Sequence, residues 1–275
     1  MSGTVGLMKA MVGDYPVTKV FRQTVPFEFA DVKVPNTAFK RVVRDLEFDL
    51  AELAIMTFLL AKAHGKPLRL LPAVVTSRFQ HPLIVYNSEK GALSPKSLEG
   101  KRVGQRSYSV TTATWIRGIL ADQYGVDMSS IRWVTFEEPH VAEFRDPPNV
   151  TRAPAGKEMM AMLLAGELDA AVVGELPDNE KIKSVIPDPA AAAQAWQKKN
   201  GAIQINHMLV VKDSVSRNDA EKFYRLFLES KAAAGNPAAN PCGLEENRRN
   251  LEVAIDCIYR QRMLPRRPTV EELFQ

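Results

Sequence analysis

The chain alternates short apolar segments with stretches whose apolar residues recur at helical spacing. Apolar runs of strand length cover residues 7–13, 48–53, 68–75, 83–88, 131–136 and 207–215. Helical spacing covers residues 38–45, 57–65, 110–124, 219–231 and 245–263. Strands that alternate with helices are typical of α/β folds, so we expect an α/β protein.

Two stretches of the chain follow the same pattern. Each of "VVRDLEFDLAEL" and "LLAGELDAAVVGEL" runs from a helix through a short turn to an aspartate and an apolar strand, so Asp49 and Asp169 occupy matching places. The echo suggests two similar α/β lobes. The alternative is that helix–turn–strand units often look alike without being repeats.

Residues near the element ends supply boundary signals. Asn36 or Thr37 could cap the helix over 38–45, and Gly65 ends the helix over 57–65. Thr269 and Glu272 have the spacing of a capping box for a last helical turn.

Composition limits the classes of partner. Of 275 residues, 45% are hydrophobic and 25% are charged, as in an ordinary globular protein, and the net charge is +4. Acidic residues are interspersed with the basic ones, and only "RQRMLPRR" is locally basic. That run lacks interleaved aromatic residues, so we expect a solvated helix end and no nucleic-acid partner. A mildly basic chain suits a small anionic substrate.

The sequence also bears on the compartment. The stretch "MSGTVGLMKAMVGDYPV" has no continuous apolar segment of signal-peptide length, and "LAELAIMTFLLAKA" is too short to span a bilayer. Cys242 and Cys257 have neither metal-type nor redox-type spacing. We expect a cytoplasmic protein with no membrane partner, and a trimmed signal peptide stays open as the alternative.

Several stretches together resemble the 4,5-dihydroxyphthalate decarboxylase family. The most specific are "TATWIRGILADQYGVD" and the ending "PRRPTVEELF", and "VGDYPVTK", "SRFQHPLIVYN" and "LLAGELDAAV" occur with them in the family's order. The family in turn resembles type II periplasmic binding proteins, which have two α/β lobes with a ligand cleft between them. This implies a lobe one of residues 1–100 and 207–275 and a lobe two of residues 101–206.

The run "GKRVGQRSYSVTTATWIRG" at the start of the second lobe is rich in hydroxyl groups. Because unpaired N–H groups at a helix start favour anions, we expect Ser107, Tyr108, Thr111 and Thr112 to contact a substrate carboxylate. The alternative is simple helix capping by Ser109 or Thr111, which needs no ligand.

The resemblance implies a non-oxidative decarboxylase that converts 4,5-dihydroxyphthalate, or a similar hydroxylated aromatic acid, to a dihydroxybenzoate (protocatechuate) and CO2. Protonation of the ring carbon that bears the carboxylate lets CO2 leave as aromaticity returns. The site needs a group that binds the other carboxylate, a proton donor near the ring and a base at the para hydroxyl. No cofactor is required in principle, although a divalent metal stays open.

Basic and aromatic residues are the candidates for substrate binding. Arg78 is the first choice to bind the carboxylate, since a guanidinium group binds it through two hydrogen bonds. Arg117 would do the same from the second lobe or lie on a solvated helix face. Trp115 would stack on the ring or only pack. Asp14, Tyr15 and Glu175 follow predicted strands and are expected at the ligand.

Three residues are the candidates for proton transfer. His81 titrates near neutral pH and closes a polar loop between two apolar strands, and His207 lies at the predicted second crossover. Glu52 interrupts an apolar segment, where a carboxylate is costly unless it is paired, so it is a candidate base or a partner to a histidine. Together they could hold a divalent metal, although their spacing fits no metal motif.

Other functions stay open at this point. The segments "PVTK" and "PDNEK" depart from the family's pattern where ligand contacts are expected. The alternatives are a non-catalytic solute-binding protein for an aromatic carboxylate and a thiamine-pyrimidine-precursor-type enzyme of the same fold. Exposed helices and the C-terminal segment are compatible with a homodimer.

Overall fold

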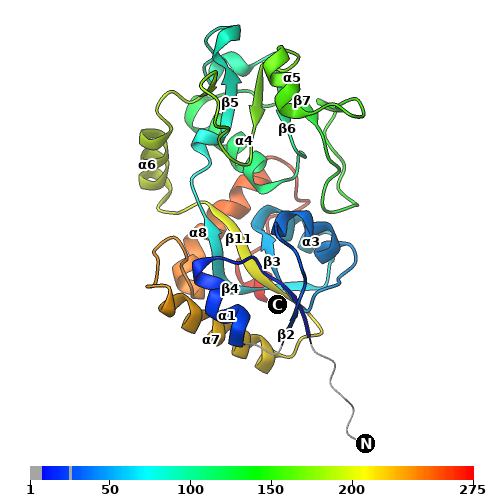
Figure 1. Cartoon of the computed structure of the whole chain (residues 1–275), viewed down its shortest axis with the longest axis vertical. Coiled ribbons are helices and arrows are strands. Elements are labelled where there is room, and N and C mark those ends of the chain that lie inside the picture. The colour runs from blue at the N-terminus through cyan, green and yellow to red at the C-terminus, as the bar shows by residue number, and fades with distance from the viewer. Residues whose placement is uncertain (1–7, 25–26) are drawn as a thin grey trace, which may run out of the picture. The chain divides into compact units, whose positions relative to one another are not determined.

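The computed structural model describes residues 8–24 and 27–275. Part of the predicted first strand, Leu7, lies outside these residues, as does the first part (residues 1–7) of the N-terminal stretch used for the compartment prediction. The chain divides into unit 1 (residues 1–78, 205–259 and 263–275) and unit 2 (residues 79–204 and 260–262). Each unit is built on its own mixed sheet (Figure 1).

Unit 1 contains a five-stranded sheet in the order β2-β1-β3-β11-β4. β1 pairs in parallel with β2 and β3, and β11 runs antiparallel between β3 and β4. The strands are β1 Met8–Met11, β2 Phe27–Phe29, β3 Leu50–Ala54, β4 Leu68–Ser77 and β11 Ile205–Lys212. The helices are α1 Lys19–Thr24, α2 Phe39–Val43, α3 Ile55–Ala63, α7 Arg217–Ala233 and α8 Leu244–Arg260, with 3-10 turns Pro16–Thr18, Pro35–Thr37 and Glu271–Phe274.

An aromatic core holds helices α1 and α7 to this sheet. Phe21 of α1 and Phe227 of α7 are fully buried, and their rings meet edge to face with centroids 6.0 Å apart. Apolar side chains of β1, β3, β4 and β11 complete the same cluster. The strands β1 and β3 are therefore packed against α1 and α7 through this cluster.

Unit 2 contains a six-stranded sheet in the order β10-β5-β9-β6-β7-β8. β9, β6, β7 and β8 are parallel, whereas β5 and β10 are antiparallel additions at one edge. The strands are β5 Ile84–Asn87, β6 Arg102–Gln105, β7 Arg132–Thr135, β8 Val150–Arg152, β9 Ala170–Val172 and β10 Ile182–Ser184. The helices are α4 Thr111–Tyr124, α5 Met159–Ala165 and α6 Pro189–Asn200, with 3-10 turns His81–Leu83, Ser88–Lys90 and Lys96–Leu98.

The lobe boundaries differ from the expected ones. Residues 79–100 belong to unit 2, because β5 pairs with β9 and β10 of that sheet. The predicted boundary near Gly100 is therefore wrong, and the chain first changes unit between Arg78 and Phe79. It returns between Gln204 and Ile205, and residues 260–262 after α8 belong to unit 2 again.

The two matching aspartates of the sequence make the same backbone hydrogen bonds in both units. The Asp49 carboxylate accepts a hydrogen bond from the Lys9 N–H at 2.9 Å, and the Asp49 N–H donates to the Lys9 carbonyl. The Asp169 carboxylate and N–H make the same two contacts with the backbone of Arg102. In each unit an aspartate thus fastens the start of one parallel strand to its neighbour.

The local boundary signals are confirmed only in part. The predicted cap by Asn36 or Thr37 is wrong, because residues 35–37 form a 3-10 turn and Ala38 is the N-cap residue of α2. Thr269 and Glu272 exchange the two hydrogen bonds of a capping box. The predicted helix over 245–263 is too long, because α8 ends at Arg260 and Arg262 has a positive φ of 57°. The short strands β2, β8 and β10 and helix α1 were not predicted.

Candidate functional site

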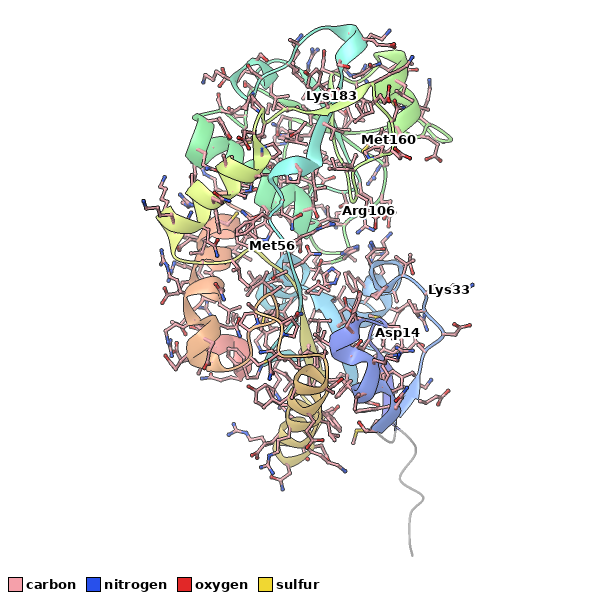
Figure 2. All side chains as sticks on the ribbon, turned by 60° about the vertical axis from the view of Figure 1, so that its left-hand side comes forward. Asp14, Lys33, Met56, Arg106, Met160 and Lys183 are labelled. Carbon is pink, nitrogen blue, oxygen red and sulfur yellow. The ribbon has the colours of Figure 1, made fainter. Side chains whose placement is uncertain are left out.

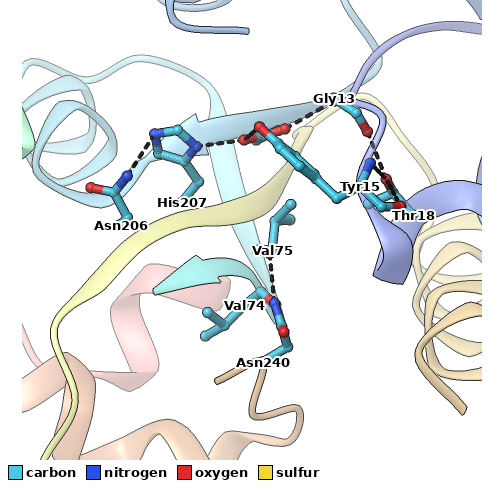
Figure 3. A network of polar contacts seen from close by, with 9 residues as sticks. Gly13, Tyr15, Thr18, Val74, Val75, Asn206, His207 and Asn240 are labelled. Carbon is cyan, nitrogen blue, oxygen red and sulfur yellow. Dashed lines mark hydrogen bonds and ion pairs between the residues drawn. The ribbon is translucent and has the colours of Figure 1, made fainter. Parts of the chain in front are cut away.

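A buried carboxylate organises the sheet edge of unit 1. Glu52 lies within β3 and is completely buried. Its Oε2 accepts from the Gly13 N–H at 2.9 Å, and its Oε1 accepts from the Tyr15 hydroxyl at 2.9 Å and from His207 Nδ1 at 2.5 Å. Figure 3 shows this network, with Gly13, Tyr15 and His207 around the carboxylate. An ionised group in the interior is tolerated because these three donors replace water.

Strand pairing explains why Glu52 and His207 meet. In the antiparallel β3–β11 pair, Leu209 is opposite Glu52 and His207 is opposite Ala54. Since side chains alternate along a strand, Glu52 and His207 share one face and are diagonal neighbours. β1 pairs in parallel on the other side of β3 and ends at Met11, which brings the following Gly13 beside Glu52.

The contacts of His207 assign its protons. Nδ1 faces the Glu52 carboxylate and therefore carries a hydrogen, while the Asn206 Nδ2 amide lies 3.4 Å from Nε2 and donates to it. The Phe39 ring meets the imidazole edge to face at 5.2 Å. The side chain is 14% exposed, whereas that of Glu52 is fully covered. His207 can thus reach a ligand, and Glu52 acts on a ligand only through its neighbours.

Tyr15 is held in its protonated form. Burial raises the pKa of its hydroxyl far above the ordinary value, and the charge and hydrogen bond of Glu52 act in the same direction. Thr18 shapes the turn that carries it, because Thr18 Oγ1 donates to the Gly13 carbonyl at 2.6 Å and accepts from the Tyr15 N–H at 2.9 Å. Asp14, between Gly13 and Tyr15, is exposed (Figure 2).

Unit 2 places the hydroxyl run against a buried arginine. Ser107, Tyr108, Ser109 and Thr111 are buried and Thr112 is half-buried. Arg117 is fully buried, so a solvated helix face is ruled out for it. Its guanidinium lies 3.7 Å from the centroid of the Tyr108 ring and bonds Gln105 Oε1, Thr114 Oγ1 and Gln261 Oε1.

The start of helix α4 is not capped in the way that the sequence left open. Val110 occupies the N-cap position and has no hydrogen-bonding group in its side chain, so neither Ser109 nor Thr111 is the N-cap residue. The Ser107 hydroxyl is completely buried and has no hydrogen-bond partner among residues 8–24 and 27–275. The hydroxyl run thus offers a hydrogen-bonding group that the fold leaves unused.

His81 lies elsewhere in unit 2. Its Nε2 is 2.8 Å from Gln123 Oε1, and its ring contacts the rings of Phe79 and Trp196 edge to face. Gln123 is near the end of α4, about 18 Å along the helix from Thr111. Trp115 packs its buried ring against Trp196. His81 and Trp115 therefore belong to the helix packing of unit 2.

The remaining predicted residues are more dispersed. Arg78, the last residue of the first unit 1 segment, is exposed, and its role as a carboxylate-binding group stays a prediction. Glu175 is exposed after β9. Within the described ranges no three His, Cys, Asp or Glu side chains gather as metal ligands.

Sequence reasoning missed several of the positioning residues. Gly13, Thr18 and Asn206 contribute to the Glu52 network, and Gln105 and Asp146 lie in the surroundings of Arg117. The stretch "YPVT" was an available signal, because a threonine three residues after the tyrosine can form a hydrogen bond with the backbone of the turn.

Comparisons with known proteins agree with the sequence resemblance. The family model described as "NMT1/THI5 like" matches residues 35–145. A "4,5-dihydroxyphthalate decarboxylase" from Comamonas testosteroni is 28% identical over 216 residues, which cover 73% of this chain and 66% of the relative. The protein of the same name from Pseudomonas putida is 29% identical over 177 residues, which cover 60% and 69%. The chain thus matches about two thirds of the length of these relatives.

Solved structures agree on the fold. The aliphatic sulphonate binding protein SsuA of Escherichia coli aligns with a TM-score of 0.57 and 12% identity, covering 98% of this chain and 92% of that one. SsuA of Xanthomonas axonopodis pv. citri aligns with a TM-score of 0.53 and 15% identity, covering 97% of each chain. The fold is that of a two-lobed periplasmic binding protein of type II. Among the described residues, no helix has both the length and the apolar character needed to cross a membrane.

Gly13 is expected to position Tyr15, and substitution tests this. A Cβ on Gly13 would lie 2.6 Å from two atoms of the Tyr15 ring, so Gly13→Ala should push the tyrosine away from Glu52. We expect the free energy of unfolding to fall by about 1–3 kcal/mol, measured by urea unfolding. In a Tyr15→Ala background the same substitution should cost much less. Equal costs in both backgrounds would contradict the packing argument.

His81 should make unit 2 sensitive to acid. Burial lowers its pKa, although the bond to Gln123 acts in the opposite direction. The unfolded chain therefore takes up this proton at a higher pH than the folded chain, and stability is lost as the pH falls below the unfolded value of about 6.5. We expect urea unfolding between pH 7.5 and 5 to show a smaller loss of stability in His81→Gln than in wild type. The exposed His64 is the control, and His64→Gln should keep the wild-type slope.

Proposed function

Because the chain is similar to 4,5-dihydroxyphthalate decarboxylases, we propose that it is a carboxy-lyase acting on a hydroxylated aromatic carboxylate. The observation that carries the proposal is the Glu52–His207 pair of unit 1. In this pair, a histidine that a ligand can reach is hydrogen-bonded to a fully buried carboxylate. A simple binding site for an anionic ring has no need of a buried carboxylate behind a histidine.

The proposed chemistry is the replacement of CO2 by a proton. Once a ligand atom has replaced the Asn206 amide at Nε2, His207 takes up a proton there and delivers it to the ring carbon that bears the carboxylate. The bond to CO2 then breaks with its electrons returning to the ring. The aromatic carboxylate and one proton thus become the decarboxylated ring and CO2. With 4,5-dihydroxyphthalate the product is 3,4-dihydroxybenzoate, in which the hydroxyl para to the reacting carbon has stabilised the cationic ring.

Glu52 supports this step in two ways. Its negative charge stabilises the imidazolium form of His207, and its hydrogen bond to Nδ1 fixes the ring so that Nε2 is the nitrogen that exchanges protons with a ligand. Tyr15 and Gly13 hold the carboxylate in place and satisfy its remaining lone pairs. Asn206 contacts Nε2 at 3.4 Å, a long bond that a closer ligand atom can replace.

The proposal leads to one assay with two variants. Purified protein given 4,5-dihydroxyphthalate should release CO2 and form the dihydroxybenzoate. His207→Asn removes the proton donor, and Glu52→Gln removes the charge that stabilises it. We expect turnover to fall at least about 100-fold in each, because positioned acid–base groups contribute roughly that much or more. Binding of the product, measured by calorimetry, should change far less.

Matched controls separate this effect from general damage. His64→Asn and Asp31→Asn alter exposed residues of unit 1 and should leave turnover unchanged. Wild-type turnover in both His207→Asn and Glu52→Gln would show that His207 is not the proton donor. Tight binding with no turnover in the wild type would indicate a binding protein for aromatic carboxylates instead. Loss of turnover in the presence of a chelator would call for a metal in the reaction.

A further inference from the structure

Three buried polar atoms of unit 2 lie unused around Arg117. They are Gln105 Nε2, Ser107 Oγ and Asp146 Oδ1, and none has a hydrogen-bond partner among residues 8–24 and 27–275. Gln105 and Ser107 are completely buried, and Asp146 is partly buried. A buried polar atom left unpaired costs about 1–3 kcal/mol, so three of them in one neighbourhood call for a common explanation.

The fold places Gln105 and Ser107 at one edge of the sheet. Gln105 ends β6, Ser107 follows it, and Asp146 lies in the segment between β7 and β8. β6 and β7 are parallel, so their carboxyl ends share that edge. The Arg106 carbonyl accepts from the N–H groups of Phe136 and Glu137, which fastens the segment after β7 to the turn after β6. Ligands of open α/β sheets bind at such edges.

Aromatic stacking also attaches Phe144, which precedes Asp146 in the same segment, to Tyr108. The Phe144 ring is stacked on the Tyr108 ring at an interplanar angle of 10°, with centroids 6.4 Å apart. Tyr108 also contacts the Arg117 guanidinium, 3.7 Å from its ring centroid, and the ring of Trp133. Asp146 lies two residues beyond Phe144. Burial raises the pKa of its carboxyl, and the charges of Arg152 and Arg117 lie close enough to act in the opposite direction.

The hydrogen-bonding character of the free Gln105 atom is fixed by Arg117. Arg117 donates to Gln105 Oε1 at 3.0 Å, so the Gln105 amide cannot turn over and its Nε2 is a committed donor. The Ser107 hydroxyl adds a second donor. Asp146 Oδ1 is an acceptor when the carboxyl is ionised. Two donors with one anionic acceptor, beside an aromatic stack, match a ring that carries both a carboxylate and a hydroxyl group.

We propose that Gln105, Ser107 and Asp146 form a subsite of unit 2 for a hydroxylated aromatic carboxylate. Gln105 and Ser107 donate to the carboxylate oxygens, and Asp146 accepts from a phenolic hydroxyl. Asp146 is then the residue that distinguishes hydroxylated rings from plain ones. The inference rests on the proposed function for its ligand class, but it assigns a specificity to unit 2 that the proton-transfer argument does not contain.

The test compares two ligands that differ only in their hydroxyl groups. Calorimetry measures binding of 3,4-dihydroxybenzoate and benzoate to wild type and to Asp146→Ala. We expect wild type to prefer the dihydroxy compound by about tenfold or more, the range of a hydrogen bond to a charged group. In Asp146→Ala the preference should fall close to one. Ser107→Ala should weaken both ligands by a similar factor and leave the preference unchanged.

Controls keep the outcome clear. Asp146→Asn preserves the shape of the side chain and should lower the preference several-fold, because a neutral amide oxygen accepts more weakly than a carboxylate. Asp178→Asn, at an exposed position of unit 2, should behave as wild type. A preference that survives both Asp146 variants, or that is absent from the wild type, overturns the assignment.

The same experiment separates this inference from the proposed function. A hydroxyl preference that depends on Asp146 in a protein that releases no CO2 supports the subsite and rejects the decarboxylase. CO2 release from 4,5-dihydroxyphthalate, with a hydroxyl preference that Asp146→Ala leaves intact, supports the decarboxylase and rejects the subsite.

Discussion

The buried Glu52 carboxylate is the constraint on which the unit 1 site depends. A charge inside an apolar strand is tolerated only where donors surround it, and here three donors come from two distant segments of the chain. Gly13 and Tyr15 follow β1, and His207 lies on β11. The carboxylate therefore fixes the turn after β1 and the imidazole at once, and removal of any one donor leaves a buried charge partly unpaired.

This constraint also explains why the turn after β1 has its particular sequence. The Tyr15 ring lies over Gly13, where any larger residue would collide with it. Thr18 bonds the backbone on both sides of the tyrosine, so the turn keeps its shape without a contribution from Asp14, which is exposed. The stretch "GDYPVT" therefore serves one purpose, the placement of a hydroxyl and an N–H against Glu52.

The sequence predicted what depends on local pattern. Apolar runs located the longer strands, and Glu52 stood out because an ionisable residue breaks such a run. The sequence could not show which histidine pairs with Glu52. The β3–β11 register decides this pairing, and the two residues are more than 150 positions apart in the chain. For the same reason β5 was assigned to the wrong lobe, since its sequence does not reveal that its partners are β9 and β10. Arg117 could not be recognised as buried, because its partners Gln105 and Gln261 are brought to it by tertiary structure.

The two units differ in how their polar groups are satisfied, and the difference suits two kinds of task. A proton donor must be held in one tautomer and orientation, so His207 and Glu52 are surrounded by partners. A group that recognises a ligand must keep its hydrogen-bonding capacity open, and Gln105 and Ser107 each retain an unused buried donor. Arg117 contributes to this openness within unit 2, because its bond to Oε1 of Gln105 leaves the amide nitrogen of Gln105 unpaired. A buried arginine can in this way decide which hydrogen-bonding group its neighbour presents.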